Sequence, residues 1–331
     1  MYLGLFGPGP NPSACFINNG KLLFWAEEER FTRIKTSPNS FPFKSIYTGL
    51  KYLNISLSDI KGIGYAWDCK NYSEDALNNL HETQKLYPSS SDYLNILAQK
   101  NLNIRYDPLK IKSYISSIFA RENISKIPPF EFFPHHLCHA ASTLILNPSR
   151  EGIIIINDGA GEIISSSIHY YDGISISEPL KTINLPNSLG SVYASLTEYL
   201  GYRAYEDEGR VMGLSCYGNY DKEIHNNFLK ILTPLSSQED FYFSDPTYRY
   251  NSNRNYGNRF SDKMVDLFGE PRRSDESPLD KRFKNIAFSL QSTLEEILIN
   301  ICEWSQKETN SEVCFFAGGV HMNCKANGNI V

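Results

Sequence analysis

The chain has 331 residues, of which 41% are hydrophobic and 21% charged, and its formal net charge is −5. This composition is ordinary for a globular protein and argues against electrostatic attraction of the whole chain to nucleic acid. The longest apolar run, "GIIIIN", has the length of a strand rather than of a membrane span, and the start "MYLGLFGPGP" lacks the features of a signal peptide. Seven scattered cysteines without a CxxC pair fit reduced thiols. We therefore expect a cytoplasmic protein that binds neither nucleic acid nor membranes.

The first thirty residues favour β-structure. "YLGLF" is a short apolar strand, and "GPGPNPS" has the composition of a turn. Asn19-Gly20 lies between two apolar runs and predicts a β-hairpin. A strand, a small-residue loop and a hairpin are also how an actin-like or sugar-kinase-like lobe begins.

Helices and strands alternate over the rest of the chain. Apolar residues recur at helical spacing in "SIYTGLKYLN", "DPLKIKSYISSIFAREN", "SVYASLTEYLG" and "FKNIAFSLQSTLEEILINICEW". The last of these carries one apolar stripe: Ile286, Leu290, Leu294, Ile297 and Ile301. "GIIIIND" predicts a strand covered on both faces, and "IISSSIHYY" predicts a second strand that forms a hairpin with it across "DGAGE". The chain is predicted to be an α/β protein.

Residues 233–280 differ from their surroundings, because they are polar, rich in aromatic residues and strewn with Ser, Asn, Asp and Pro. We interpret this segment as an irregular insertion or lid. Its run "YRYNSNRNYGNR" interleaves Arg with Tyr, and we favour a solvated loop over a nucleic-acid surface.

Three of the seven histidines stand together in "HHLCHAAS". If this stretch is a helix, His135 and His139 lie on one face about one turn apart, a spacing that suits two ligands of one divalent metal ion. Two surface histidines at a helix start are the alternative. His136 points about 100° away and is a weaker candidate, and a thiolate site that includes Cys138 is disfavoured.

Asp158 supplies a third ligand candidate. It stands at the end of the "IIII" strand, before glycines that allow close approach of an anion, and Glu162 is a second acidic residue there. An aspartate that only caps a tight turn is the alternative. The glycine turn at Gly318-Gly319, between a strand and a helix, offers a second place for a phosphate, and the two turns resemble phosphate-facing loops on opposed lobes. The basic residues of "EERFTRIKTSPNSFP" fit either a solvated helix or a cationic strip for phosphates.

Several stretches together resemble the nodulation-factor and antibiotic O-carbamoyltransferase family. In family order they are "NPSACFINNG", "EEERFTRIKTSPNSFP", "HHLCHAAS", "DGAGE", "NSLGSVYASLTEYLG", "EDEGRVMGLSCYG" and "FAGGVHMNCKANG". The resemblance implies a two-lobed, actin-like domain over residues 1–331, with mixed sheets flanked by helices. It also implies a C-terminal YrdC-like domain, absent from this chain, that makes carbamoyladenylate from carbamoyl phosphate and ATP.

The resemblance implies roles for individual residues. His135, His139 and Asp158 look like metal ligands, usually for Fe2+, with Zn2+ or Mn2+ as alternatives. Lys35, Gly159, Gly161, Ser188, Gly318, Gly319 and Asn323 look like contacts to the adenylate. Asn11 and Glu208 look like residues near the acceptor, and Glu208 or Glu162 is the candidate base that accepts a proton from the acceptor hydroxyl.

The chain departs from the family pattern at a few positions. Cys138 replaces an alanine, Arg210 replaces a lysine, and His321 stands beside the nucleotide loop, where we expect it to alter metal or nucleotide contacts. The chain stops at Val331, before the position where a fourth ligand, an aspartate, is expected, so we expect an actin-like fold that is incomplete at its C-terminus.

The predicted function is metal-assisted transfer of a carbamoyl group from carbamoyladenylate to a hydroxyl of a natural product or sugar. The alternatives are a sugar-kinase-like phosphotransferase and a truncated, inactive nucleotide-binding module. The sequence leaves open the acceptor, the metal and the oligomeric state, with a homodimer among the options.

Overall fold

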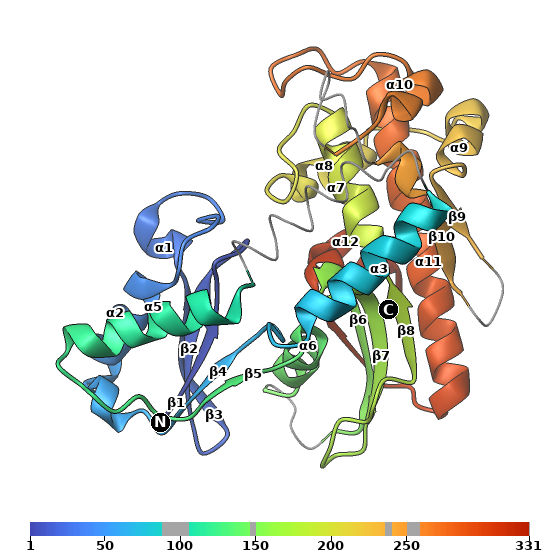
Figure 1. Ribbon diagram of the computed structural model, residues 1–331. Coiled ribbons are helices and arrows are strands. Elements are labelled where there is room, and N and C mark those ends of the chain that lie inside the picture. The colour runs from blue at the N-terminus through green and yellow to red at the C-terminus, as the bar shows by residue number, and fades with distance from the viewer. Residues whose placement is uncertain (88–105, 146–149, 236–239, 250–258, 331) are drawn as a thin grey trace. The chain divides into compact units, whose positions relative to one another are not determined.

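The computed structural model describes residues 1–87, 106–145, 150–235, 240–249 and 259–330 (Figure 1). The chain divides into two compact units. The first contains residues 1–78 and 96–138, and the second contains residues 79–95 and 139–331. Each unit is built on a mixed β-sheet with helices packed against it, which confirms the predicted α/β class.

The first unit has a five-stranded sheet in the order β3-β2-β1-β4-β5. β1, β2 and β3 are antiparallel neighbours, whereas β4 and β5 run parallel to β1. The β2–β3 hairpin turns at Asn19 and Gly20, both with positive φ, as the Asn-Gly pair predicted. The elements are β1 (Tyr2–Phe6), β2 (Ser13–Asn18), β3 (Lys21–Glu27), α1 (Glu29–Thr32), α2 (Phe43–Leu53), β4 (Gly62–Tyr65), α3 (Tyr72–Leu86, which continues into the second unit), α5 (Pro108–Arg121) and β5 (Phe130–Phe132).

The helices α2 and α5 cover the sheet of the first unit with their apolar stripes. Ile46 and Leu50 of α2 and Ile111 and Ile115 of α5 are buried in one cluster with strand residues such as Leu3. Each such side chain contributes about 1.5–3 kcal/mol when it is fully buried. The carboxylate of Asp107 accepts hydrogen bonds from the first turn of α5 and so fixes its start.

The second unit has a four-stranded sheet in the order β11-β6-β7-β8. β6, β7 and β8 are antiparallel neighbours and β11 runs parallel to β6, so these four strands are arranged as β1, β2, β3 and β4 are in the first unit. A separate two-stranded ribbon pairs β9 with β10. The elements are α6 (His135–Thr143, which begins in the first unit), β6 (Gly152–Gly161), β7 (Ile164–Tyr171), β8 (Lys181–Asn184), α7 (Leu189–Tyr199), α8 (Glu208–Ser215), α9 (Lys222–Phe228), β9 (Leu232–Pro234), β10 (Tyr242–Ser244), α10 (Asp262–Phe268), α11 (Lys281–Thr309), β11 (Cys314–Ala317), the 3₁₀ turn η5 (Gly319–Met322) and α12 (Cys324–Ile330).

Strand β6 is buried on both faces, as its unbroken isoleucine run predicted. Ile153 and Ile155 point into the main core with residues of α7 and α11. Ile154 and Ile156 point to the other face, where Ala140 of α6 packs against them. Because successive strand residues alternate between faces, this run places α7 on one side of β6 and α6 on the other.

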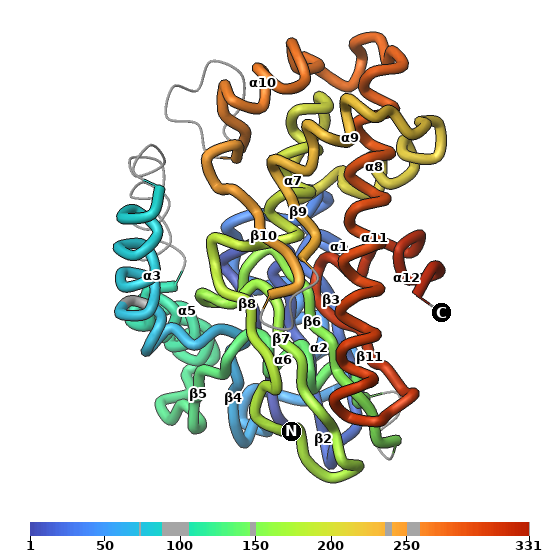
Figure 2. Tube along the Cα trace, turned by 90° about the vertical axis from the view of Figure 1, so that its right-hand side faces the viewer, coloured from blue at the N-terminus to red at the C-terminus, as the bar shows by residue number. Residues whose placement is uncertain are grey.

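Helix α11 is the longest helix of the described chain and forms the centre of the second core. The five residues of its predicted stripe are all at most 2% exposed. Asp280 caps its start, and Asn310 ends it in a left-handed conformation. Figure 2 shows α12 beside α11, and the two helices are in contact.

The segment 233–280 is more regular than predicted. It contains part of β9, β10 and α10, and Tyr242, Phe260 and Met264 are buried in the second core. Its aromatic residues therefore include packing residues, which polarity alone did not reveal. Most of the Arg/Tyr run lies outside the described residues.

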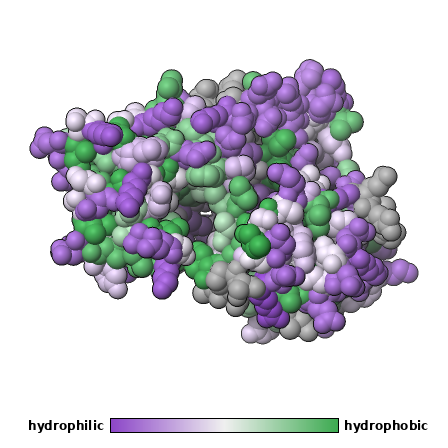
Figure 3. Space-filling model, turned by 90° about the horizontal axis from the view of Figure 1, so that it is seen from below, coloured by the Kyte–Doolittle hydropathy of each residue, from purple (hydrophilic) through white to green (hydrophobic). Residues whose placement is uncertain are grey.

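Hydrophilic and hydrophobic residues are interspersed on the face drawn in Figure 3. No helix among the described residues has the length and apolar character that crossing a membrane requires. All seven cysteines are described and free of disulfides, as expected from their spacing.

Candidate metal centre and the glycine turns beside it

Helix α6 carries the two predicted histidine ligands one turn apart. It begins at His135, directly after Pro134, whose carbonyl accepts the hydrogen bond from the Cys138 amide. The helix runs across the residue at which the chain passes from the first unit to the second. The predicted helical stretch, and hence the shared face of His135 and His139, is confirmed.

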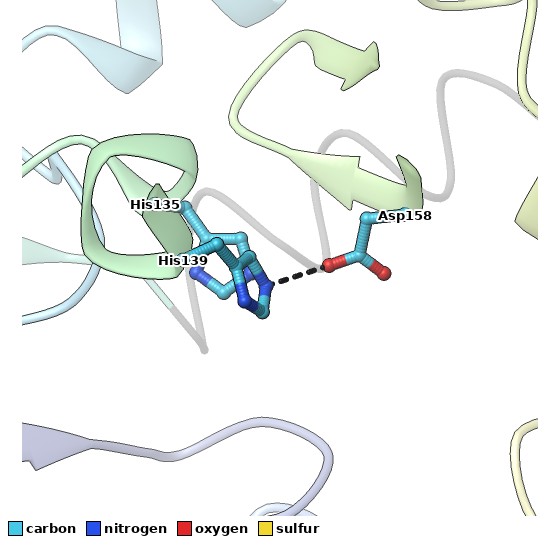
Figure 4. A group of neighbouring side chains, drawn as sticks. All are labelled: His135, His139 and Asp158. Atoms are coloured by element: carbon cyan, nitrogen blue, oxygen red, sulfur yellow. Dashed lines mark hydrogen bonds and ion pairs between the residues drawn. The ribbon is translucent and has the colours of Figure 1, made fainter. Parts of the chain in front are cut away.

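Asp158 completes a group of three with these histidines (Figure 4). One ligand atom from each of His135, His139 and Asp158 lies within 4.8 Å of the others, and His139 Nε2 is 3.0 Å from Asp158 Oδ2. Two ligands of one metal ion, each about 2.0–2.2 Å from it, lie about 3.0–3.4 Å apart at common coordination angles. The spacing of His139 and Asp158 therefore fits a shared divalent ion, and the ligand atom of His135 lies within 4.8 Å of both.

Hydrogen bonds on the far sides of the ligands orient them. His135 Nδ1 donates to the carbonyl of Ala66 at 3.0 Å, so the neutral ring presents its Nε2 lone pair as the ligand atom. Asp158 Oδ1 accepts from the Gly159 amide at 2.6 Å, while Oδ2 faces His139. Imidazole nitrogen and carboxylate oxygen together suit iron, zinc or manganese.

The other residues of the histidine cluster play different parts. His136 is only 3% exposed and does not belong to the ligand group, in line with its predicted direction. Cys138 is also outside the only group of three or more potential ligands found in the described part of the chain.

The residues after Asp158 form a bulge on β6 rather than the separate loop that "DGAGE" suggested. Regular pairing with β7 stops at Asn157 and resumes at Gly161, and Glu162 turns the chain with a φ of 51°. The first turn of α7 packs on this bulge so closely that a Cβ at Gly190 would lie 2.7 Å from the Gly159 nitrogen. The partial positive charge of a helix N-terminus therefore lies beside the Asp158–Gly159 peptide.

Ser188 caps α7 and supports the bulge. Its Oγ accepts from the Ser191 amide at 3.0 Å and donates to the Gly159 carbonyl at 2.7 Å, and the side chain is fully buried. Its hydroxyl thus holds α7 against the bulge. The predicted contact of Ser188 with an adenylate stays a prediction.

The second glycine turn meets the first one. A Cβ at Gly319 would lie 3.1 Å from Asp158 Oδ1, and a Cβ at Gly318 would overlap the carbonyl of Asn157. The prediction that the two turns belong to opposed lobes is wrong, since both belong to the second unit. The reason is the parallel pairing of β6 with β11, which brings the carboxyl ends of both strands to one edge of the sheet.

Asn323 faces the protein interior. Its side-chain amide exchanges two hydrogen bonds with Gln291 of α11, and its Oδ1 also accepts from the Ala326 amide at the start of α12. Asn323 thus fixes the helix that follows the second glycine turn. Its predicted contact to the adenylate stays a prediction.

Lys35 and Asn11 belong to the first unit, and both are exposed. The Asn11 amide donates to the carbonyl of Thr36 at 3.0 Å, so their two loops are tied together. The acidic residues before Lys35 are structural, because the buried Glu28 carboxylate accepts from the Lys44 and Ser45 amides at the start of α2. Only Glu29–Thr32 of this stretch is helical, and the role of its exposed basic residues toward phosphates stays a prediction.

Glu208 lies at the start of α8 and is linked to the first glycine turn through Tyr205. Its Oε1 accepts from the Tyr205 amide at 2.5 Å, and the Tyr205 ring lies near Gly159, where an added Cβ would be 3.7 Å from Cε1. Burial raises the pKa of the Glu208 carboxyl. A carboxyl with a raised pKa is suited to accept a proton near neutral pH.

Tyr205, Gly190 and Asn157 lie next to Asp158 or Gly159 and were not among the predicted site residues. Tyr205 has a left-handed backbone with φ 68°, which is costly for a tyrosine and is not visible in a single sequence. Gly190 had a signal, because a glycine in the first turn of a predicted helix often marks a close approach of another backbone.

Comparison with known proteins agrees with the resemblance. The family model described as "Carbamoyltransferase N-terminus" matches residues 11–331. The nodulation protein NolNO of Sinorhizobium fredii is 30% identical over 96% of this chain and 42% of its own length. An uncharacterized protein of Synechocystis is 29% identical over 99% of this chain and 52% of its own length. The chain spans about half the length of these curated relatives.

Solved structures give only a distant likeness. A putative N-acetylglucosamine kinase of Porphyromonas gingivalis covers all of this chain and 89% of its own with a TM-score of 0.36 and 13% identity. A Ppx/GppA phosphatase of Aquifex aeolicus covers 98% of both chains with a TM-score of 0.31 and 11% identity. At these scores neither protein carries an argument about function.

Proposed function

Because this chain belongs to the carbamoyltransferase family, in the part described as its N-terminus, we propose that it holds the transfer site of an O-carbamoyltransferase. The reaction would move a carbamoyl group from carbamoyladenylate to a hydroxyl of a natural product or sugar. The observation that carries this proposal is the grouping of His135, His139 and Asp158 beside two glycine turns.

His135, His139 and Asp158 would hold Fe2+, or alternatively Zn2+ or Mn2+. When bound, such an ion supplies a Lewis acid that polarises a carbonyl and stabilises the oxyanion that develops on it. The protein's part is to orient the ligands. The Ala66 carbonyl fixes the ring of His135, and the Gly159 amide fixes one oxygen of Asp158.

The adenylate would lie against the two glycine turns. Backbone amides near Gly159, Gly161, Gly318 and Gly319 and the start of α7 offer donors and partial positive charge to a phosphate. Ser188 and Asn323 support this surface by holding α7 and α12, and they would contact the nucleotide through the same turns. Lys35 of the first unit would add a positive charge.

Glu208 would accept the proton of the acceptor hydroxyl, with Glu162 as the alternative base, and Asn11 and Glu208 would line the acceptor site. The raised pKa of Glu208 supports the first choice. The carbamoyladenylate would be supplied by an activity that makes it from carbamoyl phosphate and ATP, with release of phosphate and pyrophosphate.

Two other functions remain to be distinguished by experiment. A sugar-kinase-like phosphotransferase would use the glycine turns but has no need of the His/His/Asp group. An inactive nucleotide-binding module would keep the turns without transferring anything. The ligand group and the family membership favour carbamoyl transfer over both.

Metal analysis tests the ligand group. We expect the wild-type chain to bind about one Fe or Zn, and His135→Ala and His139→Ala to lose it, since a site of few protein ligands does not survive the loss of one. His81→Ala, which removes an exposed histidine of α3, is the matched control and should bind metal normally. Unchanged metal content in both ligand variants would exclude the metal centre.

Supplied carbamoyladenylate tests the transfer step. Carbamoylation of a hydroxyl acceptor by the wild-type chain, lost in His139→Ala but kept in His81→Ala, would support the proposed reaction. Nucleotide binding without transfer to any of a panel of sugar and aminoglycoside acceptors would favour the inactive module.

A further inference from the structure

His321 is a buried histidine next to the second glycine turn, and its ring faces inward. It lies in η5, two residues after Gly319, is 9% exposed, and stacks on Phe316 with ring centroids 4.7 Å apart. Both ring nitrogens are hydrogen-bonded: Nε2 to Asn157 at 3.0 Å and Nδ1 to Asn327 at 3.1 Å. These contacts are to side chains of β6 and α12, two elements that meet at the turn.

The hydrogen-bonding pattern fixes the tautomer of His321. The Asn327 Nδ2 donates to the carbonyl of His321, an atom that can only accept, so Asn327 Oδ1 faces the ring. His321 Nδ1 must therefore carry the proton, and Nε2 must accept from Asn157 Nδ2. This orientation leaves Asn157 Oδ1 to accept from the hydroxyl of Ser166 at 2.7 Å, as observed.

The result is one continuous chain of hydrogen bonds from Ser166 of β7 through Asn157 and His321 to Asn327 of α12. Its middle member, Asn157, directly precedes Asp158. On the other side, Gly318 packs against the backbone of Asn157, and Gly319 packs beside the Asp158 carboxylate. The hydrogen bond of Asn157 to His321 therefore restrains the end of β6 from which Asp158 projects.

We propose that His321 is a positioning residue, which sets the direction of the Asp158 carboxylate and the spacing of the two glycine turns through Asn157. This inference rests on the proposed function, because it concerns the ligand group of the same site. It assigns His321 a role inside the fold, through which the residue would alter the metal contacts as its position in the sequence led us to expect.

Co2+ binding by the full chain tests the proposal. His321→Leu keeps the volume but removes both ring hydrogen bonds, and we expect it to weaken Co2+ binding 10- to 100-fold, the usual effect of losing a group that orients a ligand. His321→Gln can accept from Asn157 and donate to Asn327, and we expect it to retain affinity within about threefold of wild type.

The control is His169→Leu. His169 is a histidine of like burial in the same unit, 6% exposed, but its hydrogen bonds go to Ser177 and Ser167 and not to the end of β6. We expect this variant to bind Co2+ as the wild type does, even if it is less stable. If His321→Leu does not fold, Asn327→Ala replaces it, since it removes both hydrogen bonds of Asn327 to His321 but keeps the His321 ring, and it should weaken binding several-fold.

The outcomes separate the inference from the proposed function. Wild-type affinity in His321→Leu, together with loss of binding in His139→Ala, would overturn the role of His321 and leave the metal centre standing. Equal weakening by His169→Leu would also overturn it, because the effect would then be general destabilisation. If the wild type does not bind Co2+, or His139→Ala binds it equally well, both the metal centre and this inference fail.

Discussion

Four strands of each unit share one arrangement, but only the second unit carries a residue of the ligand group directly after the first of these strands. In the first unit the order is β3-β2-β1-β4, and in the second it is β8-β7-β6-β11, with the same parallel and antiparallel pairs. The connection after β1 is a proline-rich turn tied to the sheet by the Tyr65 hydroxyl, which donates to the Gly7 carbonyl. The connection after β6 is the bulge that carries Asp158. A shared topology therefore does not decide where the ligands lie.

The surroundings of His135 and those of Asp158 also differ in kind. Around His135, the first unit provides aromatic rings: Trp67 stacks on Tyr106 with centroids 3.9 Å apart, and the rings of Phe6 and Trp67 lie 5.6 and 5.1 Å from the His135 ring. Around Asp158, the second unit provides close backbone packing and buried hydrogen bonds. The comparison predicts that small backbone or polar changes affect the second unit more.

The largest effect is expected for Gly318→Ala. The new methyl group would overlap the Asn157 carbonyl, and the φ of 91° at this position is strained for alanine, so we expect a loss of about 3–5 kcal/mol in the free energy of unfolding. Gly64→Ala, on β4 of the first unit, is the matched change: its methyl group meets only the ring edge of Phe133 at 3.1 Å, which can shift. We expect that variant to lose about 1 kcal/mol or less.

Denaturant unfolding of the two variants, followed by probes in each unit, checks this contrast. Similar losses of unfolding free energy in Gly318→Ala and Gly64→Ala would show that the closer backbone packing in the second unit does not affect stability. Gly328→Ala, in open space on α12, controls for the substitution itself and should be neutral or slightly stabilising.

Much of the fold was predictable because its signals are local. Three predicted elements depend only on residues close together in the sequence, and all three were confirmed. They are the strand with the isoleucine run (β6), the helix with the apolar stripe (α11) and the turn at Asn19-Gly20. The grouping of His135 with His139 followed from helix geometry alone. That Asp158 would join them depended on the expectation that ligands gather at the carboxyl ends of strands.

What the sequence did not reveal depends on contacts between distant residues. The two glycine turns share one unit because β11, more than 150 residues after β6, returns to pair with it. The inward direction of Asn323 follows from its pairing with Gln291 on α11, and the burial of Phe260 follows from packing against Tyr199. Residue type and spacing carry no information about such partners. The adenylate contact of Asn323 stays a prediction.

A second prediction uses acid pH to sharpen the contrast between the units. Burial lowers the pKa of His321 to about 4, well below its ordinary value near 6.5. The unfolded chain therefore binds this proton more strongly, so the contribution to stability is complete above pH 6.5 and is lost as the pH falls toward 4. The difference amounts to about 3 kcal/mol, all of it in the second unit.

His321→Gln isolates this contribution, because the glutamine does not titrate. We expect the wild type to lose about 3 kcal/mol more than the variant between pH 7 and pH 4 in denaturant unfolding. If the free energy of unfolding of the two proteins changed equally with pH, the folded protein would accommodate a charged His321. That result would contradict the lowered pKa.

The smallest effect concerns two ion pairs, one in each unit. Lys325 Nζ and Glu295 Oε1 of the second unit are 2.8 Å apart with side chains 34% and 14% exposed, and Glu295 also accepts hydrogen bonds from Gln291 and Asn329. Arg30 and Glu27 of the first unit are 3.3 Å apart, with Arg30 67% exposed.

Solvent screens the exposed pair more, so double-mutant cycles should give a coupling of about 1 kcal/mol for Lys325–Glu295 and less than about 0.5 kcal/mol for Arg30–Glu27. The substitutions Lys325→Met with Glu295→Gln, and Arg30→Met with Glu27→Gln, supply the two cycles. Equal coupling energies would mean that the hydrogen bonds to Glu295 do not strengthen the Lys325–Glu295 ion pair. Of the polar contacts of the second unit, only those of His321 would then be expected to contribute to stability.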